Sequence, residues 1–449
     1  MRIARREAIG AAIGLGLVAA AFVVPRMHWG IASYLRVPDR FAWHAGAAPI
    51  FGLLEAHVGW GTGPAIALGL AAVLWGPVVA QRLSWRALPL VAWATSCVWA
   101  FSLAMIDGWQ RGFAGRLTDK DEYLPQVPGI TNIPETLRTF SSRIVDFQPN
   151  SWITHVSGHP PGALLTFVWL DRIGLGGGAW AGLLCLLVGS SAAGAIVITL
   201  RTLADEPTAR SAAAFVAVAP TAIWIAVSAD GYFAGVAAWG ITLLALAVRG
   251  AVRFPGLLGA AAGLLLGWSV FLSYGLMLMA IPALAVLVCA SDWRSVLRTL
   301  VPALLAAAAV AAMFTATGFC WLDGYSLVQQ RYWQGIAHER PFQYWSWANL
   351  AAVVCAIGLG GVAGLSRVFD LTAIRRRSGL HLLMLAMLIA IICADVSMLS
   401  KAETERIWLP FTVWLTAAPA LSPPRSARLW LAINVGGALL LNSLIFTHW

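Results

Sequence analysis

Long apolar runs alternate with shorter polar segments along almost the whole chain. Because a helix rises about 1.5 Å per residue and must cross about 30 Å of hydrocarbon, apolar windows near 20 residues are typical of membrane-crossing helices. The pattern predicts an all-α polytopic membrane protein with about thirteen such helices. They lie near residues 8–25, 62–80, 88–106, 179–200, 209–228, 231–248, 255–272, 275–291, 299–316, 346–365, 380–397, 407–421 and 428–446.

The charges between these windows separate into two sets. With the N-terminus in the cytoplasm, the cytoplasmic segments receive seventeen arginines and only five acids. The opposite face receives fourteen of the twenty acids. Basic residues concentrate on the cytoplasmic side of membrane proteins, so the sorting predicts a multi-pass protein of the cytoplasmic (inner) membrane with its acidic loops outside.

Composition supports the membrane assignment. Hydrophobic residues make up 59% of the 449 residues and charged residues 11%, with a mean hydropathy of +0.76. No polar segment is long enough to bury a core of its own, so we expect one membrane unit. A net charge of +10 would suggest nucleic acid in a soluble protein. Here the sorting of basic loops explains it, and we expect no nucleic-acid partner.

The segment 161–175 decides the orientation of everything after it. Its apolar part is about 12 residues, or roughly 18 Å as a helix, which is too short to cross the membrane. Counting it as a crossing helix would place the three arginines at 375–377 outside. We therefore expect an amphipathic interfacial helix on the outer surface, with Trp169, Asp171 and Arg172 near the lipid headgroups.

The longest polar interruption, residues 107–158, carries candidate catalytic carboxylates. Asp107 follows an apolar window directly, which places it at the bilayer boundary, and Asp121 and Glu122 precede Tyr123 further along the same loop. Carboxylates at such a surface can act as general bases or bind a metal. Solvated loop carboxylates without a function are the alternative. For Asp107 and Glu122 we favour a functional role.

Two histidines lie close to this loop's end. His155 and His159 are four residues apart and precede Pro160 and Pro161, which disfavour helix before them and so weaken a shared metal site. A phosphate or carboxylate partner for His159 and a purely structural histidine are both open. We assign no metal ligand.

Other outer loops combine basic and aromatic residues. Arg331, together with Tyr325 and Trp333, forms a set that could hold a phosphate and stack on sugar rings. The alternative is an interfacial aromatic belt.

A short outer loop holds four charged residues: Lys401, Glu403, Glu405 and Arg406. Arg406 could bind a lipid phosphate while the acids orient it, or the four could form salt bridges with one another. Asp230 begins a window and is a candidate helix cap or substrate ligand. Asp395 is the one acid well inside a window, and so few buried charges argue against a coupled transporter.

These residues resemble a known family. An acid closing a helix (Asp107), an outer loop with Asp121-Glu122-Tyr123, and His159-Pro160-Pro161-Gly162 opening a surface helix are similar to the GT-C superfamily of integral membrane glycosyltransferases. The stretch Glu405-Arg406-Ile407-Trp408-Leu409-Pro410 resembles the late-loop motif of bacterial members that act on cell-envelope glycans. The resemblance covers roughly 88–420.

The resemblance implies a division of the chain and roles for its residues. Residues 1–87 would add N-terminal transmembrane helices and an outer loop, 88–420 would form the catalytic unit with outer loop 107–175, and 421–449 the last helix. The first long outer loop of the family carries the catalytic carboxylate. By position Asp107 matches it, and by sequence motif Asp121-Glu122 matches; of the two, Asp107 ranks first. Contacts to the donor phosphate are implied for His159, Arg331, Arg406 and Lys401, and contacts to the sugar or acceptor for Tyr123, His155, Asp230, Tyr325, Trp333, Glu403 and Glu405.

The resemblance also implies an activity. The expected protein is an inverting glycosyltransferase that moves a monosaccharide, mannose or arabinofuranose, from a polyprenyl-phosphate donor to a glycan or glycolipid on the outer face of the membrane. Membrane lipid is a further expected partner, and a divalent cation, Mg²⁺ or Mn²⁺, stays open as a cofactor. A polyprenyl-phosphate or glycolipid translocase without chemistry is the alternative function, and a non-catalytic scaffold is a third.

Overall fold

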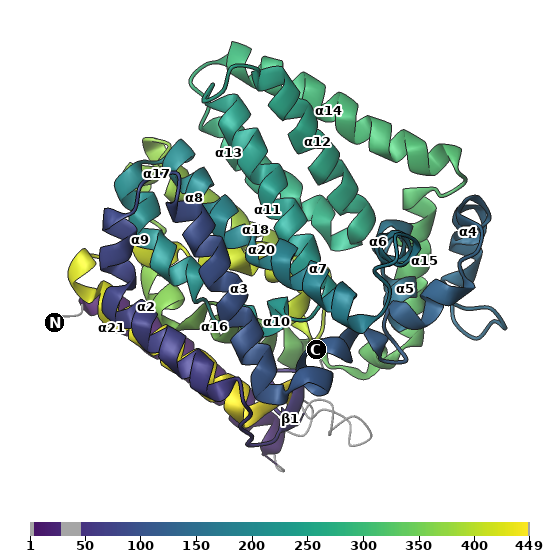
Figure 1. The fold of residues 1–449 in the computed structure, drawn as a ribbon, viewed down its shortest axis with the longest axis horizontal. Helices are drawn as coiled ribbons and strands as arrows, with labels where there is room; N and C mark the ends of the chain where they lie inside the picture. Colours follow the sequence, from purple (N-terminus) through teal and green to yellow (C-terminus); the bar gives the residue numbers. More distant parts are fainter. Residues whose placement is uncertain (1–3, 28–45, 448–449) are drawn as a thin grey trace.

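The apolar windows fold as predicted into an all-helical membrane protein. The computed structural model describes residues 4–27 and 46–447. The first outer loop, expected at 26–60 between the first two apolar windows, therefore lies partly outside the described residues. Within the described part, ten helices are long and apolar enough to cross a membrane. They are α1 (Arg5–Val23), α2 (Thr62–Arg82), α3 (Leu88–Asp107), α7 with α8 (Gly178–Ser190 and Ala192–Leu203), α11 (Ala229–Val248), α12 (Pro255–Leu272), α14 (Trp293–Ala316), α16 (Phe342–Leu365), α18 (Gly379–Val396) and α21 (Ala427–Leu444) (Figure 1).

The three remaining windows form shorter helices because prolines interrupt them. Proline lacks a backbone N–H and its ring clashes with the preceding turn, so it ends or breaks a helix. Window 209–228 becomes α9 (Glu206–Ala217) and α10 (Ala222–Ile225), and window 275–291 becomes a 3₁₀ turn followed by α13 (Ala280–Val288). Window 407–421 becomes α20 (Leu409–Leu415) and a further 3₁₀ turn. The prolines are Pro220, Pro282, Pro410 and Pro419.

The segments outside the crossing helices are also mostly helical. Short helices α4 to α6 and α15 lie together at one end of the molecule (Figure 1). The short helices in these segments are α4 (Ile133–Thr139), α5 (Thr154–Gly158), α6 (Pro161–Arg172), α15 (Trp321–Gln334), α17 (Leu371–Arg375) and α19 (Thr404–Ile407).

Helix α6 is the short helix expected at 161–175. At 12 residues it is too short to cross the membrane, as predicted. Its residues 161–168 are all buried by protein, and only its last turn, with Trp169, is exposed. A Cβ at Gly162 would lie 2.5 Å from the carbonyl oxygen of Phe271, so glycine is needed where α6 meets the end of α12. The helix is thus held inside the protein over most of its length.

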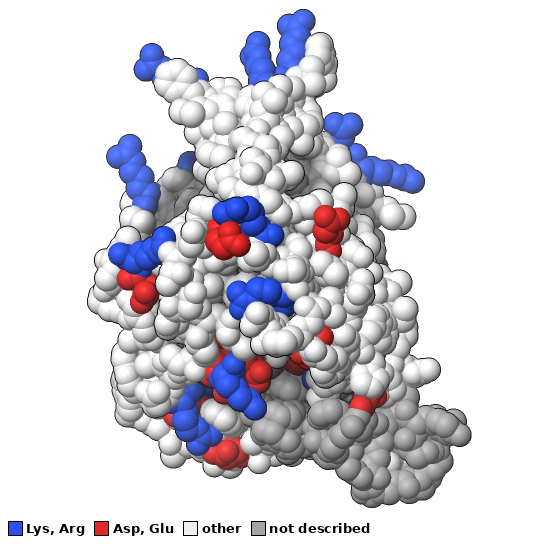
Figure 2. All heavy atoms as spheres, turned by 90° about the vertical axis from the view of Figure 1, so that its right-hand side faces the viewer, with Lys and Arg blue, Asp and Glu red and all other residues white. Residues whose placement is uncertain are grey.

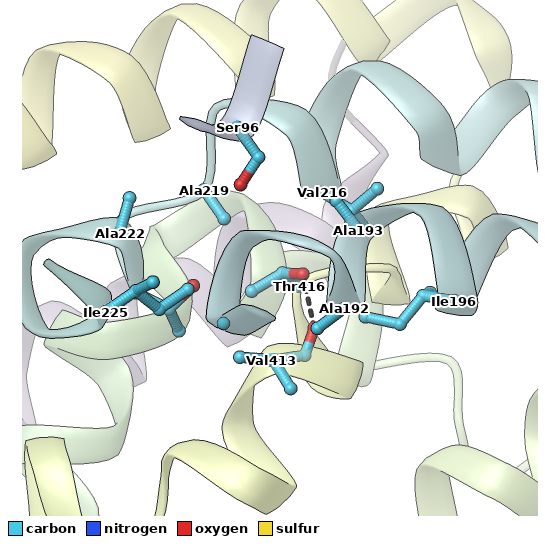
Figure 3. A pocket seen from close by; sticks show the side chains of 12 residues that line it. Ser96, Ala192, Ala193, Ile196, Val216, Ala219, Ala222, Ile225, Val413 and Thr416 are labelled. Atoms are coloured by element: carbon cyan, nitrogen blue, oxygen red, sulfur yellow. Dashed lines mark hydrogen bonds between the residues drawn. The ribbon is translucent and has the colours of Figure 1, made fainter. Parts of the chain in front are cut away.

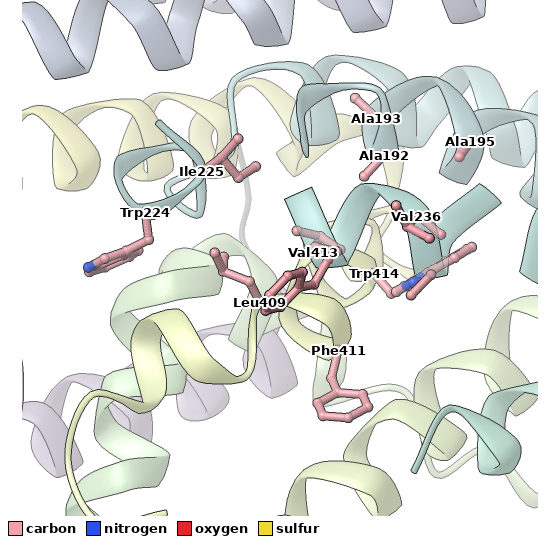
Figure 4. Packing of buried hydrophobic residues seen from close by; sticks show 14 of the residues in the cluster. Ala192, Ala193, Ala195, Trp224, Ile225, Val236, Leu409, Phe411, Val413 and Trp414 are labelled. Carbon is pink, nitrogen blue, oxygen red and sulfur yellow. The ribbon is translucent and has the colours of Figure 1, made fainter. Parts of the chain in front are cut away.

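The core centres on α11, which contacts α7, α8, α12, α13, α14 and α20. Figure 4 shows how Val236 of α11 lies with Ala192 of α8 and with Val413 and Trp414 of α20. Small residues bring α12 and α14 close together. A Cβ at Gly263 would lie 2.0 Å from the carbonyl oxygen of Ala303, a spacing typical of tightly packed membrane helices.

Two short strands join the ends of the described chain. Strand β1 (Gly52–Leu54) pairs antiparallel with β2 (Ile445–Thr447), with Gly52 opposite Thr447. The pairing holds the segment before α2 against the end of α21. It therefore brings the first outer loop and the last residues to the end of α3.

One small cavity lies in the core among α3, α8, α9, α10 and α20. Ser96, Ile225 and Thr416 are among its lining residues, and its volume is about 10 Å³ (Figure 3). The Thr416 hydroxyl donates to the carbonyl oxygen of Val413 at 2.6 Å. A single water needs at least roughly 10–15 Å³, so this cavity is too small for a substrate.

Candidate functional site

Polar residues from four segments of the chain meet at one end of α11. The outer loop supplies Glu122, α5 supplies His155, the first turn of α11 supplies Asp230 and α19 supplies Arg406. All four side chains are buried. Burying charged groups costs free energy unless they pair, so we expect these four side chains to contact one another.

A chain of contacts links Glu122 to Arg406 through His155. Glu122 Oε1 lies 3.1 Å from His155 Nδ1, and His155 Nε2 lies 3.2 Å from Arg406 Nη2. A guanidinium group can only donate, so Nε2 accepts and the ring proton of neutral His155 is on Nδ1, facing the carboxylate. Glu122 Oε2 has no hydrogen-bond partner among the described residues. One carboxylate oxygen thus faces His155, while the other is buried without a hydrogen-bond partner among the described residues.

Arg406 also holds two other acids. Its Nη1 lies 3.0 Å from Asp230 Oδ2, and its Nη2 lies 3.3 Å from Glu403 Oε2. Asp230 is not the cap of α11. Ser228 caps that helix by accepting from the N–H of Gly231. Arg406 joins α11, α19 and the outer loop in one buried network.

The network shifts the pKa of its members. Burial raises the pKa of Glu122 to about 8, against the lowering effect of Arg406 and with the raising effect of Asp230. Burial and the charge of Arg406 hold the pKa of His155 well below its usual range. Burial opposes the charge of Arg406, but its three carboxylate neighbours raise the pKa of Arg406 overall. At neutral pH the site therefore contains a neutral histidine, a charged arginine and a carboxyl group near its titration point.

His159 and Tyr123 form the wall beside this network. His159 Nδ1 lies 2.9 Å from Tyr123 Oη and 2.8 Å from the carbonyl oxygen of His155. Their rings also pack against Phe167 and Phe233. Burial lowers the pKa of His159, so the ring is neutral at physiological pH. Tyr123 thus packs against the rings of both histidines.

The loop before α19 is strained and held by one asparagine. Ala402 and Glu403 both have positive φ, at 68° and 63°, a region that non-glycine residues rarely adopt. Asn349 of α16 donates to Asp395 at 2.8 Å and to the carbonyl oxygen of Ser400 at 2.9 Å, and accepts from the N–H of Ala402 at 3.2 Å. Asn349 is 1% exposed. It fixes the backbone that places Glu403 and Arg406.

We expect Asn349→Ala to lower kcat at least tenfold because the loop would lose these hydrogen bonds and relax, since small displacements of positioned groups are costly to catalysis. Asn434→Ala is the matched control: Asn434 is also buried and also bonds α16, through the N–H of Gly360. Both variants are compared at equal amounts of folded protein. Equal kcat values for the two would remove the positioning role of Asn349.

Lys401 lies in a second basic group next to Glu403. Its ammonium donates to the carbonyl oxygen of Arg340 at 2.9 Å and lies 4.8 Å from the ring centroid of Trp333. The Arg340 guanidinium lies 3.1 Å from Glu403 Oε1. Burial, together with the charge of Arg340, lowers the pKa of Lys401. Arg340 and Arg406, both buried, therefore share the carboxylate of Glu403.

Glu405 faces the first outer loop. Its Oε1 accepts from the N–H of Phe51 at 2.9 Å, and its Oε2 has no hydrogen-bond partner among the described residues. Burial raises the pKa of Glu405 to about 7. Glu405 thus fastens the segment before α2 to α19.

Three other predicted site residues lie around the network. Arg331 of α15 lies 2.5 Å from Asp146 and holds the outer loop against that helix. Tyr325 stacks on Trp321 with ring centroids 5.3 Å apart. Asp121 accepts from the Thr154 hydroxyl at 3.2 Å, and its carbonyl oxygen accepts from the N–H of His155. Asp121 therefore positions α5 next to Glu122.

Asp107 lies in a separate cluster. Its Oδ2 lies 2.8 Å from Arg116 and its Oδ1 lies 2.6 Å from His57 Nε2, while His57 Nδ1 lies 2.6 Å from the carbonyl oxygen of Glu55. The two ring nitrogens of His57 thus face the Glu55 carbonyl oxygen and the Asp107 carboxylate. Arg116 also donates to the carbonyl oxygen of Thr447 at 2.6 Å. Asp107 thus joins α3, the outer loop and the β1–β2 pair.

Sequence reasoning did not single out Asn349, Arg116 or His57. Asn349 lies near one end of an apolar window, and Asp395 lies inside another. Two single polar residues in different windows are a weak signal for the buried hydrogen bond between them. For His57 and Arg116 the partner is 50 and 9 residues away, with nothing local to mark it.

The described residues contain no group of three or more His, Cys, Asp and Glu side chains arranged to hold a metal ion. The acids of the network are instead bridged by arginine, since Arg406 contacts both Asp230 and Glu403. A role for Mg²⁺ or Mn²⁺ stays an open expectation.

Comparison with known proteins identifies a similar fold. No family model and no curated protein match the chain. A solved structure of the oligosaccharyltransferase from Archaeoglobus fulgidus, in complex with zinc and sulfate, matches with a TM-score of 0.52 and 14% identity. The fold is GT-C-like. The match covers 80% of this chain, which spans about half (53%) of that structure, and at this identity the similarity is one of fold.

Proposed function

We propose that this protein is a glycosyltransferase that moves a monosaccharide from a polyprenyl-phosphate donor to a hydroxyl of a glycan or glycolipid on the outer face of the membrane. The observation that carries the proposal is the buried chain of contacts from Arg406 through His155 to Glu122. The second carboxylate oxygen of Glu122 has no hydrogen-bond partner among the described residues. The oligosaccharyltransferase with a similar fold supports glycosyl transfer as the reaction class.

Glu122 is the proposed general base. Its carboxylate takes the proton of the acceptor hydroxyl while the hydroxyl oxygen attacks the anomeric carbon, and the bond from that carbon to the phosphate oxygen breaks with inversion. The His155 contact at 3.1 Å orients the carboxylate, and Arg406 fixes the ring of His155. Asp107 is a poorer candidate because both of its oxygens are already engaged, one by Arg116 and one by His57.

Basic side chains next to the network are the proposed partners of the leaving phosphate. Arg406, Arg340 and Lys401 are buried, and Arg340 contacts the short loop that carries the other two, so water screens their charge little. Preorganised cations of this kind stabilise charge that develops in a transition state. The released polyprenyl phosphate stays in the bilayer.

The distribution of buried charge favours an enzyme over a translocase. A translocase needs a polar path to the other face, whereas the buried charged residues of the described chain gather at the α11 end that carries Asp230. The exception is Glu7, which is paired with Arg367 near the start of α1. The rest of α11 is apolar.

The rate of transfer should rise with pH up to about 8. A carboxyl group with a pKa of about 8 is about one-tenth ionised at pH 7 and about one-hundredth at pH 6, and only the ionised form accepts the proton. We expect kcat/KM to fall about tenfold per pH unit below pH 7. Glu405→Gln, which removes another buried carboxyl whose pKa is raised, should keep this profile. A flat profile between pH 6 and 9 would exclude Glu122 as the base.

Purified protein incubated with radiolabelled polyprenyl-phosphate mannose or arabinofuranose and a membrane glycolipid extract tests the reaction class. Thin-layer chromatography should show a labelled product that depends on the protein. The two sugars come from the family resemblance, and the assay decides between them. Absence of product from every donor would refute the enzymatic proposal.

A further inference from the structure

A pocket of about 220 Å³ lies at the end of α11 opposite the candidate site. It is lined by residues at the end of α11, before α12 and at the start of α14, including Arg249, Asp292, Ser295 and Arg298. The volume is well above the roughly 10–15 Å³ that a single water needs. Helix α11 has 20 residues and is therefore about 30 Å long, which separates this pocket from Asp230 by the thickness of a bilayer core.

The pocket carries an excess of positive charge. Arg249 donates to the carbonyl oxygen of Cys289 at 3.1 Å, and Arg298 has no hydrogen bond or ion pair within the described part of the chain. The only acid in the lining, Asp292, caps α14 by accepting from the N–H of Ser295 at 2.8 Å. On the side of the molecule seen in Figure 2, the upper end carries Lys and Arg without Asp or Glu.

Apolar side chains surround the mouth of this pocket. Phe254 and Trp293 are 58% and 66% exposed, and each lies next to an arginine that packs over its ring. Leu257 of α12 and Leu297 of α14 are also exposed, and both helices continue from the pocket along the lipid-facing surface. Exposed aromatic residues beside arginines at a helix end are typical of the membrane interface. The general enrichment of arginine in cytoplasmic loops would explain the charges of Arg249 and Arg298. It would not explain why they line a pocket next to exposed apolar side chains.

We propose that this pocket binds the phosphate of an anionic phospholipid in the leaflet opposite the candidate site. Arg249 and Arg298 hold the phosphate, and the acyl chains lie along the exposed leucines of α12 and α14. Basic pockets between transmembrane helices favour anionic headgroups. The proposal does not depend on the glycosyltransferase activity.

Native mass spectrometry of the full-length protein tests the proposal, with phosphatidylglycerol, phosphatidylcholine and inorganic phosphate as probes. We expect the wild type to retain phosphatidylglycerol in preference to phosphatidylcholine. The double variant Arg249→Gln/Arg298→Gln should bind phosphatidylglycerol about 30-fold more weakly. The matched control is Arg82→Gln/Arg86→Gln, which removes two exposed arginines at the end of α2 and before α3, on the same face and outside the pocket lining. It should bind like the wild type.

Three outcomes would overturn the proposal: equal retention of the two lipids by the wild type, unchanged binding in the double variant, or full displacement of the lipid by inorganic phosphate. The last would assign the pocket to a soluble phosphate. If the double variant does not fold, Arg298→Gln alone serves as the test because Arg298 is exposed. Weaker phosphatidylglycerol binding is expected for it too.

Discussion

Glu122→Gln should lower kcat by about 10²–10⁴-fold, the usual contribution of a general base, and leave the protein folded. The variant can keep an oxygen facing His155, at the position where Oε1 now lies 3.1 Å from Nδ1 of that ring. It loses only the proton affinity of the other oxygen. Transfer rates are measured with the donor that gives product, at saturating concentration.

The same variant should be more stable than the wild type at high pH. Burial raises the pKa of Glu122 from 4.5 to about 8 in the folded protein, so folding opposes its ionisation. The free energy of unfolding therefore falls as pH rises from about 4.5 to about 8, and the penalty is complete above that range, with an upper limit of about 5 kcal/mol. Glutamine never ionises. We expect a higher melting temperature for the variant at pH 9 and near equality at pH 5.

Loss of activity with a gain in stability separates a catalytic residue from a structural one. Glu135→Gln is the matched control: it neutralises an exposed carboxylate on the same loop, whose surface pair with Arg138 contributes about 0–1 kcal/mol. It should change neither property. Full activity in Glu122→Gln together with loss of activity in Asp121→Asn would move the base to Asp121.

Asp107→Asn should instead destabilise the protein. Asp107 and Arg116 have side chains that are 6% and 7% exposed, and the amide would leave a buried guanidinium without its charge partner. Breaking such a pair typically costs about 3–5 kcal/mol. We expect a lower melting temperature and yield, with kcat per folded molecule within a few-fold of the wild type.

Glu55→Gln provides the control for this cluster. It removes the partner of Arg111 in a pair that is 41–49% exposed and should have little effect on the melting temperature. The result that contradicts this account is a stable Asp107→Asn protein without activity. Asp107 would then be the base, as its position at the end of a span first suggested.

Hydropathy predicted the membrane helices well because crossing a bilayer requires long apolar runs. It overestimated three of them, where Pro220, Pro282 and Pro410 divide the apolar windows into short helices. Helix α6 was predicted not to cross, since its length could be read directly from the sequence. That its first eight residues are covered by protein could not be read, because packing against α12 depends on the tertiary fold.

Local patterns located the segments of the candidate site but not the contacts within it. The outer loop with Glu122, the prolines after His159 and the loop with Arg406 all stood out in the sequence. Their pairing did not, because the Arg406 contact to His155 joins positions 251 residues apart. The ranking of Asp107 over Glu122 rested on position relative to the bilayer. The contacts of Asp107 with His57 and Arg116 could be seen only in the fold.

Proteoliposomes loaded with an acceptor glycolipid and a doubly labelled polyprenyl-phosphate sugar give the most direct test of the central claim. One label on the sugar and the other on the lipid follow both products of transfer. The account predicts that wild type forms labelled glycolipid and free polyprenyl phosphate in equal amounts, whereas Glu122→Gln forms neither. Intact donor that moves between leaflets at the same rate in both proteins, without either product, would contradict it and identify a translocase.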